Sequence, residues 1–234
     1  MAEYLSKFTT TAAYNSAKSD LTLPHVSLTE DTMKVHFDPY SPYVAVDLGL
    51  TSGLKWANVN VGAMNETEAG MYFSWGNTFG FYAGETYDFS GIDDDTEEFL
   101  DPYKSTPGAK LSGNIPTNIT YDAARKNMGG SWRMPTTSDF QELYDECTWT
   151  QTTRNSVDGF LVTSKATGNT NSIFLPAAGC WGEGSISDIG LCGYYWASSL
   201  SDSLSGYRLF FDSERPIPDD YFIRCFGFPV RGVK

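Results

Sequence analysis

The amino-acid sequence predicts an α+β domain with two helices and several short antiparallel strands, preceded by a smaller N-terminal element. Short segments rich in β-branched and aromatic residues recur between Gly, Ser, Asn and Thr, as strands of antiparallel sheets do. Two segments near the middle of the chain instead carry apolar residues at helical spacing between recognisable start and stop signals. Two helices set among many short strands are typical of an α+β domain.

The N-terminal part of the chain differs in character from the rest. Residues 9–19 predict a short helix, and residues 26–37 alternate apolar and polar side chains as a small hairpin does. Two prolines then interrupt the pattern. We therefore divide the chain into a separate adaptor element, residues 1–40, and one domain, residues 41–234.

The expected strands of the domain come early and late in its sequence. Segments 44–50, 54–62 and 70–76 each carry β-branched or aromatic residues between turn-forming residues. Residues 160–179 contain two apolar runs on either side of the turn sequence GNTN, and so predict a hairpin.

The first predicted helix has a clear beginning and end. We expect it to begin near Thr120 as N-cap, with Asp122 in its first turn, because these residue types satisfy the free N–H groups of a helix start. Gly129 and Gly130 predict its end.

The second predicted helix begins at Ser138, which forms a capping box with Gln141. Between the two helices, residues 132–135 predict a brief extended link. The apolar residues that follow recur on one helical face, which we expect to be buried. These residues are Phe140, Leu143, Tyr144 and Cys147.

Composition excludes several classes of function. The formal net charge is −13, with 29 acidic and 16 basic residues, whereas nucleic-acid binding needs clustered Lys and Arg. Anionic membranes are disfavoured for the same reason, and the apolar runs are too short to cross a bilayer. We expect a soluble chain without a secretory signal, and the acidic run 92–102, which lacks the ligand order of an EF-hand, to be a solvated loop.

The four cysteines lie far apart in the sequence. Cys147, Cys180, Cys192 and Cys225 form no C-x-x-C pair, so neither a zinc site nor a thioredoxin-like motif is predicted. Buried free thiols are the expected state, and a Cys180–Cys192 bridge stays open as an alternative. We expect neither a metal nor a cofactor.

Catalytic arrangements also find little support. His25 and His36 are the two histidines, and both precede the main domain, which excludes His-dependent triads there. A carboxylate pair for glycoside cleavage could come from the second helix, but its acidic residues are predicted to form a solvated face. These residues are Asp139, Glu142, Asp145 and Glu146.

Several motifs, in the same order, resemble one known family, the Fibrobacter/Bacteroides major paralogous domain. This family is a branch of the C-type lectin fold, related in architecture to formylglycine-generating enzyme. The resemblance covers nearly all of residues 44–234 and implies a C-type lectin-like fold for the domain. Its motifs are VDLGLTSGLKWANVNVGA at 46–63, DAARKNMGGSWRMPTTSDFQELYDECTW at 122–149, NSIFLPAAG at 171–179, GYYWASS at 193–199 and GFPVRGV at 227–233.

The enzyme branch of this family implies an oxidase, which we keep as a remote alternative. GGSW at 129–132 is similar to part of the oxidase signature, but Cys180 and Cys192 lack the motif that surrounds its reactive pair. Calcium-dependent sugar binding is also disfavoured, because the E-P-N or Q-P-D triplet and the W-N-D triplet of such lectins are missing.

A subset of the family fits better, namely the variable proteins diversified by retroelements. In these proteins adenine changes in AAY codons replace residues of the C-terminal region, here about 193–233, and cannot yield Lys, Gln, Glu, Met or Trp. From Leu200 to Phe228 only Glu214 belongs to that forbidden set, and Asn is absent from the segment. This composition is typical of a diversified segment.

Alternation within residues 206–212 predicts which side chains of this region are exposed. We expect one face, buried, to carry Tyr207, Leu209 and Phe211. We expect the other face, exposed, to carry Gly206, Arg208, Phe210 and Asp212.

The resemblance also separates framework residues from ligand-binding ones. The framework residues are Arg224, Gly227, Phe228, Val230, Arg231 and Val233. Exposed Phe, Tyr and Arg side chains supply much of the contact energy at interfaces, although Phe222, Phe226 and Cys225 could also be core residues. The predicted ligand-binding residues are Ser201, Ser203, Leu204, Gly206, Arg208, Phe210, Asp212, Arg215, Ile217, Asp219, Asp220, Tyr221, Phe222, Ile223, Cys225 and Phe226.

Residues 3–37 resemble the beginning of structural proteins encoded by phages of Bacteroides. This resemblance implies a non-enzymatic receptor-binding protein of a phage tail, assembled in the bacterial cytoplasm, with residues 1–40 bound to virion tail proteins. The expected target is a host cell-surface protein or glycan, and a homotrimer would suit a fibre tip. The alternative is a bacterial cell-surface adhesin or a pilus-tip protein. No nucleic-acid partner and no membrane insertion are expected.

Overall fold

The computed structural model describes residues 26–28, 35–37, 42–85, 108–182 and 184–234. The chain divides into two compact units, Met1–Ser41 and Pro42–Lys234. Their boundary lies one residue beyond the predicted one. Each unit is described by itself.

The smaller unit contains an antiparallel pair of strands, β1 (Val26–Leu28) and β2 (Val35–Phe37). The register places Val26 opposite Phe37 and Leu28 opposite Val35. The predicted hairpin is therefore confirmed in its strand pairing. The predicted helix at 9–19 lies outside the described residues, as does the acidic run at 92–102.

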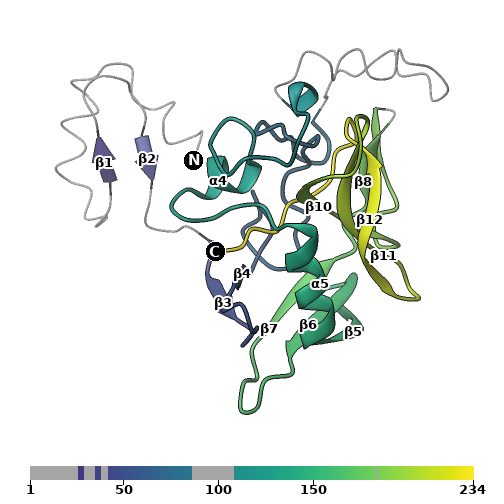
Figure 1. Ribbon diagram of the computed structural model, residues 1–234. Coiled ribbons are helices and arrows are strands. Elements are labelled where there is room, and N and C mark those ends of the chain that lie inside the picture. Colours follow the sequence, from purple (N-terminus) through teal and green to yellow (C-terminus); the bar gives the residue numbers. More distant parts are fainter. Residues whose placement is uncertain (1–25, 29–34, 38–41, 86–107, 183) are drawn as a thin grey trace. The chain divides into compact units, whose positions relative to one another are not determined.

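The larger unit combines helices and strands as an α+β domain does (Figure 1). Its described residues contain two α-helices, one short 3-10 helix and ten strands. The helices are α4 (Ala123–Met128) and α5 (Thr137–Glu146), and the 3-10 turn spans Gly108–Lys110. The strands are β3 (Ala45–Asp47), β4 (Lys55–Ala57), β5 (Cys147–Arg154), β6 (Val157–Ser164), β7 (Ser172–Pro176), β8 (Cys180–Gly182), β9 (Ser185–Ser187), β10 (Gly193–Leu200), β11 (Ser205–Phe211) and β12 (Pro216–Ile223).

All strand pairs within the described sheets are antiparallel. Two sheets have three strands, in the orders β5-β6-β7 and β10-β11-β12, and two have two strands, β3-β4 and β8-β9. Helix α5 packs against β10, β11 and β12 and also contacts β5. In Figure 1 it lies between the ribbons of the two larger sheets. The helix therefore joins these two sheets.

Both helices begin at caps that differ from the predicted ones. Asp122, rather than Thr120, is the N-cap of α4, and its carboxylate accepts the N–H of Arg125 at 2.9 Å. For α5 the capping box joins Thr136 and Asp139, not Ser138 and Gln141. Thr136 directly follows the extended link and has an extended backbone itself. The helix therefore starts before Phe140, the first apolar residue of its buried face.

The buried face of α5 is confirmed in part. Phe140, Leu143 and Cys147 are buried, although Cys147 is already the first residue of β5. Tyr144 was predicted to be buried, and this is wrong, because 38% of its surface is exposed. It lies near the end of the helix, beside an open pocket that its ring lines.

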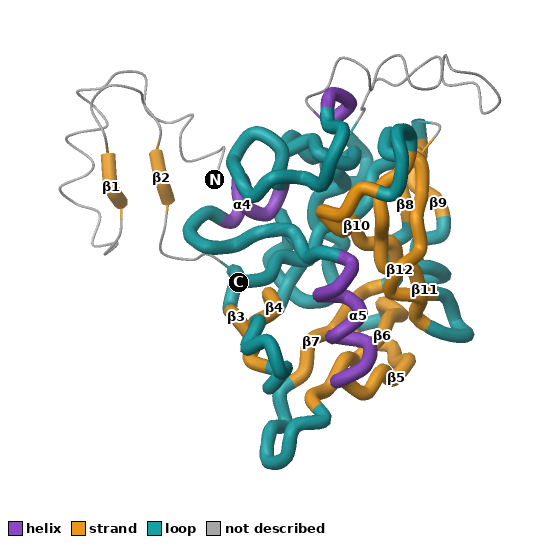
Figure 2. Tube along the Cα trace, viewed as in Figure 1, coloured by secondary structure: helices purple, strands orange, loops and turns teal. Residues whose placement is uncertain are grey.

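Several predicted strands are shorter than expected. The segments at 44–50 and 54–62 shrink to β3 and β4. Segment 70–76 is largely loop, in which Tyr72 and Phe73 form isolated bridges with Phe81 and Phe228 (Figure 2). The hairpin at 160–179 is confirmed by the pairing of β6 with β7, and β5 is an additional strand that the sequence reasoning missed.

The core of the larger unit has two main clusters. One lies beneath α5 and brings Phe140 and Leu143 against Tyr195 and Leu209 of the β10-β11-β12 sheet. The other contains Trp75, Trp196 and Phe228 together with the buried residues of α4. The β10-β11-β12 sheet contributes to both clusters, so its two faces are both covered over much of their area.

The C-terminal segment closes the domain against its beginning. Val233 bridges both Trp56 and Arg133, and the Lys55 N–H donates to the carbonyl of Lys234 at 2.8 Å. The predicted framework residues of this segment are all buried, as expected of a scaffold. They are Arg224, Gly227, Phe228, Val230, Arg231 and Val233.

Candidate functional site

The predicted ligand-binding residues lie on β11, β12 and the loops at their ends. Three of the sixteen, Gly206, Arg208 and Cys225, are buried. The exposed ones are Ser203, Leu204, Arg215, Asp219 and Tyr221. The half-buried ones are Ser201, Phe210, Asp212, Ile217, Asp220, Phe222, Ile223 and Phe226.

The expectation that Gly206 is exposed is wrong. The indole of Trp75 lies directly on this glycine, and an added Cβ would come within 2.5 Å of the ring. The Trp75 indole N–H also donates to the carbonyl of Ala197 at 2.9 Å, which fixes the ring in that position. Gly206 therefore belongs to the framework, because only glycine leaves room for the tryptophan.

The expectation that Arg208 is exposed is also wrong, since only 7% of its surface is accessible. Strand β11 is the central strand of its sheet, and core residues cover both of its faces. Alternation along the strand therefore separates two covered faces rather than a buried face from a wet one.

Aromatic rings surround the guanidinium of Arg208. Its central carbon lies 4.4 Å from the ring centroid of Phe222 and 4.7 Å from that of Tyr194. The rings of Phe228 and Phe210 follow at 5.1 Å and 5.3 Å. A cation over the face of an aromatic ring is attracted by the ring quadrupole, so these rings stabilise the buried charge.

One carboxylate completes this arrangement. Asp220 lies opposite Arg208 in the β11–β12 register, and its Oδ2 accepts from Arg208 Nε at 2.8 Å and from Nη2 at 2.7 Å. Within the described residues, Nη1 of Arg208 is buried without a hydrogen-bond partner. Burial lowers the pKa of Arg208, and Asp220 opposes this shift.

Two residues at this cluster were missed by the sequence reasoning. The hydroxyl of Tyr194 donates to Oδ2 of Asp188 at 2.8 Å, and burial raises the pKa of Tyr194. Asp188 has a positive φ of 59°, and it is followed by Ile189 and Gly190 in the β9–β10 loop. The D-x-G sequence was the available signal for this turn.

Three phenylalanines form the outer part of the cluster, and we call them the aromatic patch: Phe210, Phe222 and Phe226. Phe222 and Phe226 meet edge to face at 4.7 Å between ring centroids. Phe226 rests on Gly182, where an added Cβ would come within 2.2 Å of its ring. All three rings are half-buried, so each combines a packed side with an accessible one.

Tyr221 lies on the opposite face of the sheet from the aromatic patch. It pairs with Tyr207 across β11 and β12, and their rings make an edge contact at 6.4 Å. Because paired residues share a face, Tyr221 belongs to the side on which Leu209 and Phe211 are buried. It is nevertheless 57% exposed, since β12 is the edge strand.

Aspartate side chains shape the loops at the two ends of β11. Asp202 Oδ1 accepts the N–H groups of Leu204 and Ser205 at 2.7 and 2.8 Å. Asp212 Oδ1 likewise accepts the N–H of Glu214 at 2.8 Å and that of Arg215. Such side-chain bonds hold a turn without help from the rest of the protein.

The cysteines are all free thiols. Burial raises the pKa of Cys225 to about 12 and that of Cys147 to about 11. Cys225 is 2% exposed, so its predicted place on an accessible surface is wrong. Cys180 and Cys192 are unbridged, and the Cys180 thiol lies 3.3 Å from the Ser187 hydroxyl.

The acidic residues of α5 bind neighbouring groups rather than forming only a solvated face. Glu142 accepts the N–H and the hydroxyl of Ser52 at 2.8 and 2.6 Å, and Glu146 accepts the N–H of Thr51 at 2.8 Å. Asp139 pairs with Arg133 at 2.7 Å. These carboxylates hold a turn and a helix start.

Searches for a metal centre and a membrane span found neither in the part of the chain that the structure describes. No group of three or more His, Cys, Asp or Glu side chains there could hold a metal ion. No helix among those residues has the length and apolar character needed to cross a bilayer.

Comparison with known proteins adds no assignment. No family model, no curated protein and no solved structure matches the chain.

Proposed function

We propose that the chain is a non-enzymatic ligand-binding protein, with a C-type lectin-like domain whose β11–β12 hairpin and adjoining loops form a diversified binding surface. The observation that carries the proposal is a contrast in burial. Five of the sixteen predicted ligand-binding residues are exposed and eight are half-buried, whereas all six predicted framework residues are buried. A recognition surface on a fixed scaffold needs this division.

The chemistry of the surface supports this reading. Tyr221 and Leu204 present large apolar groups, and the aromatic patch adds three partly accessible rings on the opposite face of the sheet from Tyr221. Aromatic side chains give much contact area for little conformational entropy, which makes them effective anchors in a binding surface. Arg215 and Asp219 add exposed charges of both signs, which serve specificity.

The biological setting of the proposal comes from the resemblances in the sequence. We propose a receptor-binding protein of a phage tail, assembled in the bacterial cytoplasm and directed at a host cell-surface protein or glycan. Residues 1–40 would attach it to virion tail proteins. Display as a homotrimer would raise avidity without any new contact.

A binding assay tests the surface. Fluorescently labelled full-length protein is incubated with a panel of intact Bacteroides cells, and cell-bound fluorescence is measured. We expect the triple variant Phe210→Ala, Tyr221→Ala, Phe222→Ala to lose at least tenfold in affinity while keeping its native circular dichroism. Phe79→Ala is the matched control, because Phe79 is a 72% exposed aromatic outside the surface. Undiminished binding of the folded triple variant would reject the surface.

Sequencing tests diversification separately. The coding segment for residues 193–233 is sequenced deeply from a natural population. We expect substitutions to concentrate at the thirteen accessible positions and at adenines, and to spare Gly206, Arg208 and Cys225, because these three are buried. Substitutions spread evenly over the segment, or as frequent at Gly206 as at Tyr221, would contradict the proposal.

A further inference from the structure

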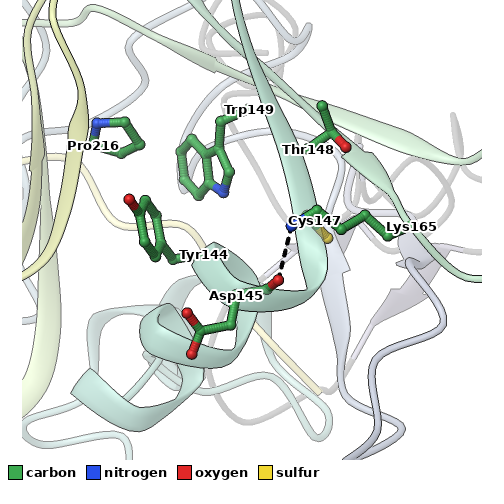
Figure 3. A pocket seen from close by; sticks show the side chains of 7 residues that line it. All are labelled: Tyr144, Asp145, Cys147, Thr148, Trp149, Lys165 and Pro216. Atoms are coloured by element: carbon green, nitrogen blue, oxygen red, sulfur yellow. Dashed lines mark hydrogen bonds between the residues drawn. The ribbon is translucent and has the colours of Figure 1, made fainter.

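A second concave site lies outside the sixteen predicted positions. It is an open pocket of about 460 Å³ between the end of α5, the start of β5 and the first residue of β12 (Figure 3). Side chains from three elements of the fold and from Lys165 thus meet there. The lining residues are Tyr144, Asp145, Cys147, Thr148, Trp149, Lys165 and Pro216.

The apolar part of the pocket consists of rings in fixed positions. Tyr144 and Trp149 lie 6.4 Å apart between ring centroids at an angle of 48°. The Trp149 indole N–H donates to the carbonyl of Leu143 at 3.3 Å, and Phe160 packs against the indole at 6.0 Å. Figure 3 shows the Pro216 ring beside these two. The rings therefore form a wall of the pocket whose position is fixed by the fold itself.

The polar part of the pocket offers both donors and acceptors. The Lys165 ammonium donates to the backbone carbonyl of Asp145 at 2.8 Å, which leaves two of its three N–H groups for a ligand. The Asp145 carboxylate accepts from Gln141 at 3.1 Å and has further lone pairs to offer. Thr148 is exposed. In Figure 3 these polar residues lie below and to the right of the rings.

We propose that this pocket binds a pyranose residue of a neutral glycan. The C–H groups on one face of a pyranose carry partial positive charge and pack against the negative faces of aromatic rings. Its hydroxyls donate and accept, as Asp145 and Lys165 together require. These two residues also cancel each other's charge, so a neutral ligand fits the pocket.

Other ligands fit these groups less well. A polyproline peptide would pack on the rings, but its backbone has carbonyl acceptors and no N–H donors for the Asp145 carboxylate. A quaternary ammonium group would be attracted by the rings, but it has no N–H or O–H to donate to the Asp145 carboxylate and no lone pair to accept from Lys165. The proposal is independent of the function proposed for the β11–β12 surface.

Tryptophan fluorescence provides a specific readout for this pocket. The chain has six tryptophans. Five of them are at most 4% exposed, namely Trp56, Trp75, Trp132, Trp181 and Trp196, whereas Trp149 is half-buried. Quenching by acrylamide, which requires contact with the indole, therefore reports mainly on Trp149.

The experiment measures acrylamide quenching of the full chain with a panel of neutral sugars: methyl α-mannopyranoside, maltose, cellobiose and diacetylchitobiose. We expect at least one sugar to lower the quenching constant at least twofold below about 50 mM, the range of weak single-site binding. Tyr144→Ala should weaken this protection at least tenfold, because it removes half of the ring wall. Phe79→Ala, an exposed aromatic elsewhere, should leave it unchanged.

Several results would overturn the proposal. These are no protection by any sugar of the panel, protection by a short polyproline peptide in place of the sugars, or full protection in a folded Tyr144→Ala variant. The Lys165→Met variant adds a second check, because it keeps the rings and removes the donors. We expect it to lose affinity severalfold, and unchanged affinity would contradict the role of the polar rim. Cell binding through the β11–β12 surface should be unaffected by Lys165→Met, so the two proposals can fail separately.

Discussion

Two of the three buried arginines of the C-terminal region, Arg231 and Arg208, are held in different ways. The guanidinium of Arg231 is fully buried and donates to Asn60 Oδ1 at 2.8 Å, to the carbonyl of Ala57 at 3.0 Å and to that of Phe174 at 2.8 Å. Arg208 has one carboxylate partner, Asp220, and otherwise contacts rings. Fixed oxygens surround the guanidinium of Arg231 in place of water, whereas aromatic faces surround most of the guanidinium of Arg208.

The sequence distances of these bonds show what each arginine connects. The partners of Arg231 lie 171, 174 and 57 residues away, so this side chain ties the end of the chain to β4, to the loop after it and to β7. Asp220 lies 12 residues from Arg208, within the same hairpin. Arg231 therefore joins distant segments of the framework by hydrogen bonds, whereas the side-chain hydrogen bonds of Arg208 stay within its hairpin.

The largest effect is expected from Arg231→Met. This change leaves three buried oxygens without their donor, and each such group costs about 1–3 kcal/mol. We expect the free energy of unfolding to fall by about 3–5 kcal/mol, measured by urea denaturation. Arg215→Met is the control, because Arg215 is exposed and should change stability by less than about 0.5 kcal/mol. A similar loss of stability in Arg231→Met and Arg215→Met would contradict the proposed role of the Arg231 hydrogen bonds.

Arg208→Met should destabilise the protein less. The Met side chain keeps contact with the rings, and Asp220 is accessible enough to be hydrated when its partner is gone, with 29% of its side chain exposed. We expect a loss of about 2 kcal/mol, mostly from the lost cation–ring attraction. If urea denaturation shows a loss as large as for Arg231→Met, Arg208 is part of the framework and the hairpin is not separable from it.

The periodic spacing of apolar residues in the sequence predicted part of the buried core. Phe140 and Leu143 recur at helical spacing, and both are buried in the core as expected. Periodicity failed at Tyr144, because the helical spacing of apolar residues continues there although 38% of this residue is exposed. It also failed on β11, where alternation distinguishes two faces but carries no information on what lies over each one.

Tertiary contacts decided the remaining positions. Arg208 reads as a surface residue by type, and its burial depends on Tyr194 and Phe228, which lie outside the hairpin. Gly206 reads as a variable position, and its role depends on the indole of Trp75, more than one hundred residues earlier. The pocket at Trp149 could not be predicted either, since β5 was missed and Pro216 comes from a distant strand.

The stability of the protein at alkaline pH should show whether Cys225 belongs to the buried framework or to the accessible surface of the hairpin. Burial raises the pKa of this thiol from 9.0 to about 12, so the unfolded chain loses the proton first. Its contribution to stability is fully present below pH 9 and is lost as the pH rises from 9 to about 12. Between pH 8 and pH 10 this amounts to about 1.4 kcal/mol.

Urea denaturation under reducing conditions at these two pH values measures the effect. In Cys225→Ala the alkaline loss should be smaller than in the parent protein by about 1.4 kcal/mol. Cys192→Ala is the comparison, since Cys192 is the least buried of the four cysteines and should change the alkaline loss less. An equal alkaline loss in Cys225→Ala and the parent would mean that Cys225 is accessible, and thus a member of the hairpin surface.

The smallest effect on stability is expected from Tyr221→Ala. Its ring is 57% exposed and makes one edge contact with Tyr207, so the free energy of unfolding should change by less than about 0.5 kcal/mol. Tyr207→Ala is the matched variant on the opposing strand, and it should cost about 2 kcal/mol or more because Tyr207 packs against the first core cluster. If the two tyrosines prove equally important for stability, β12 is as much a part of the scaffold as β11. If Tyr221 can be removed freely while its neighbour cannot, the edge strand carries side chains that the fold does not need, and such side chains are free to serve recognition.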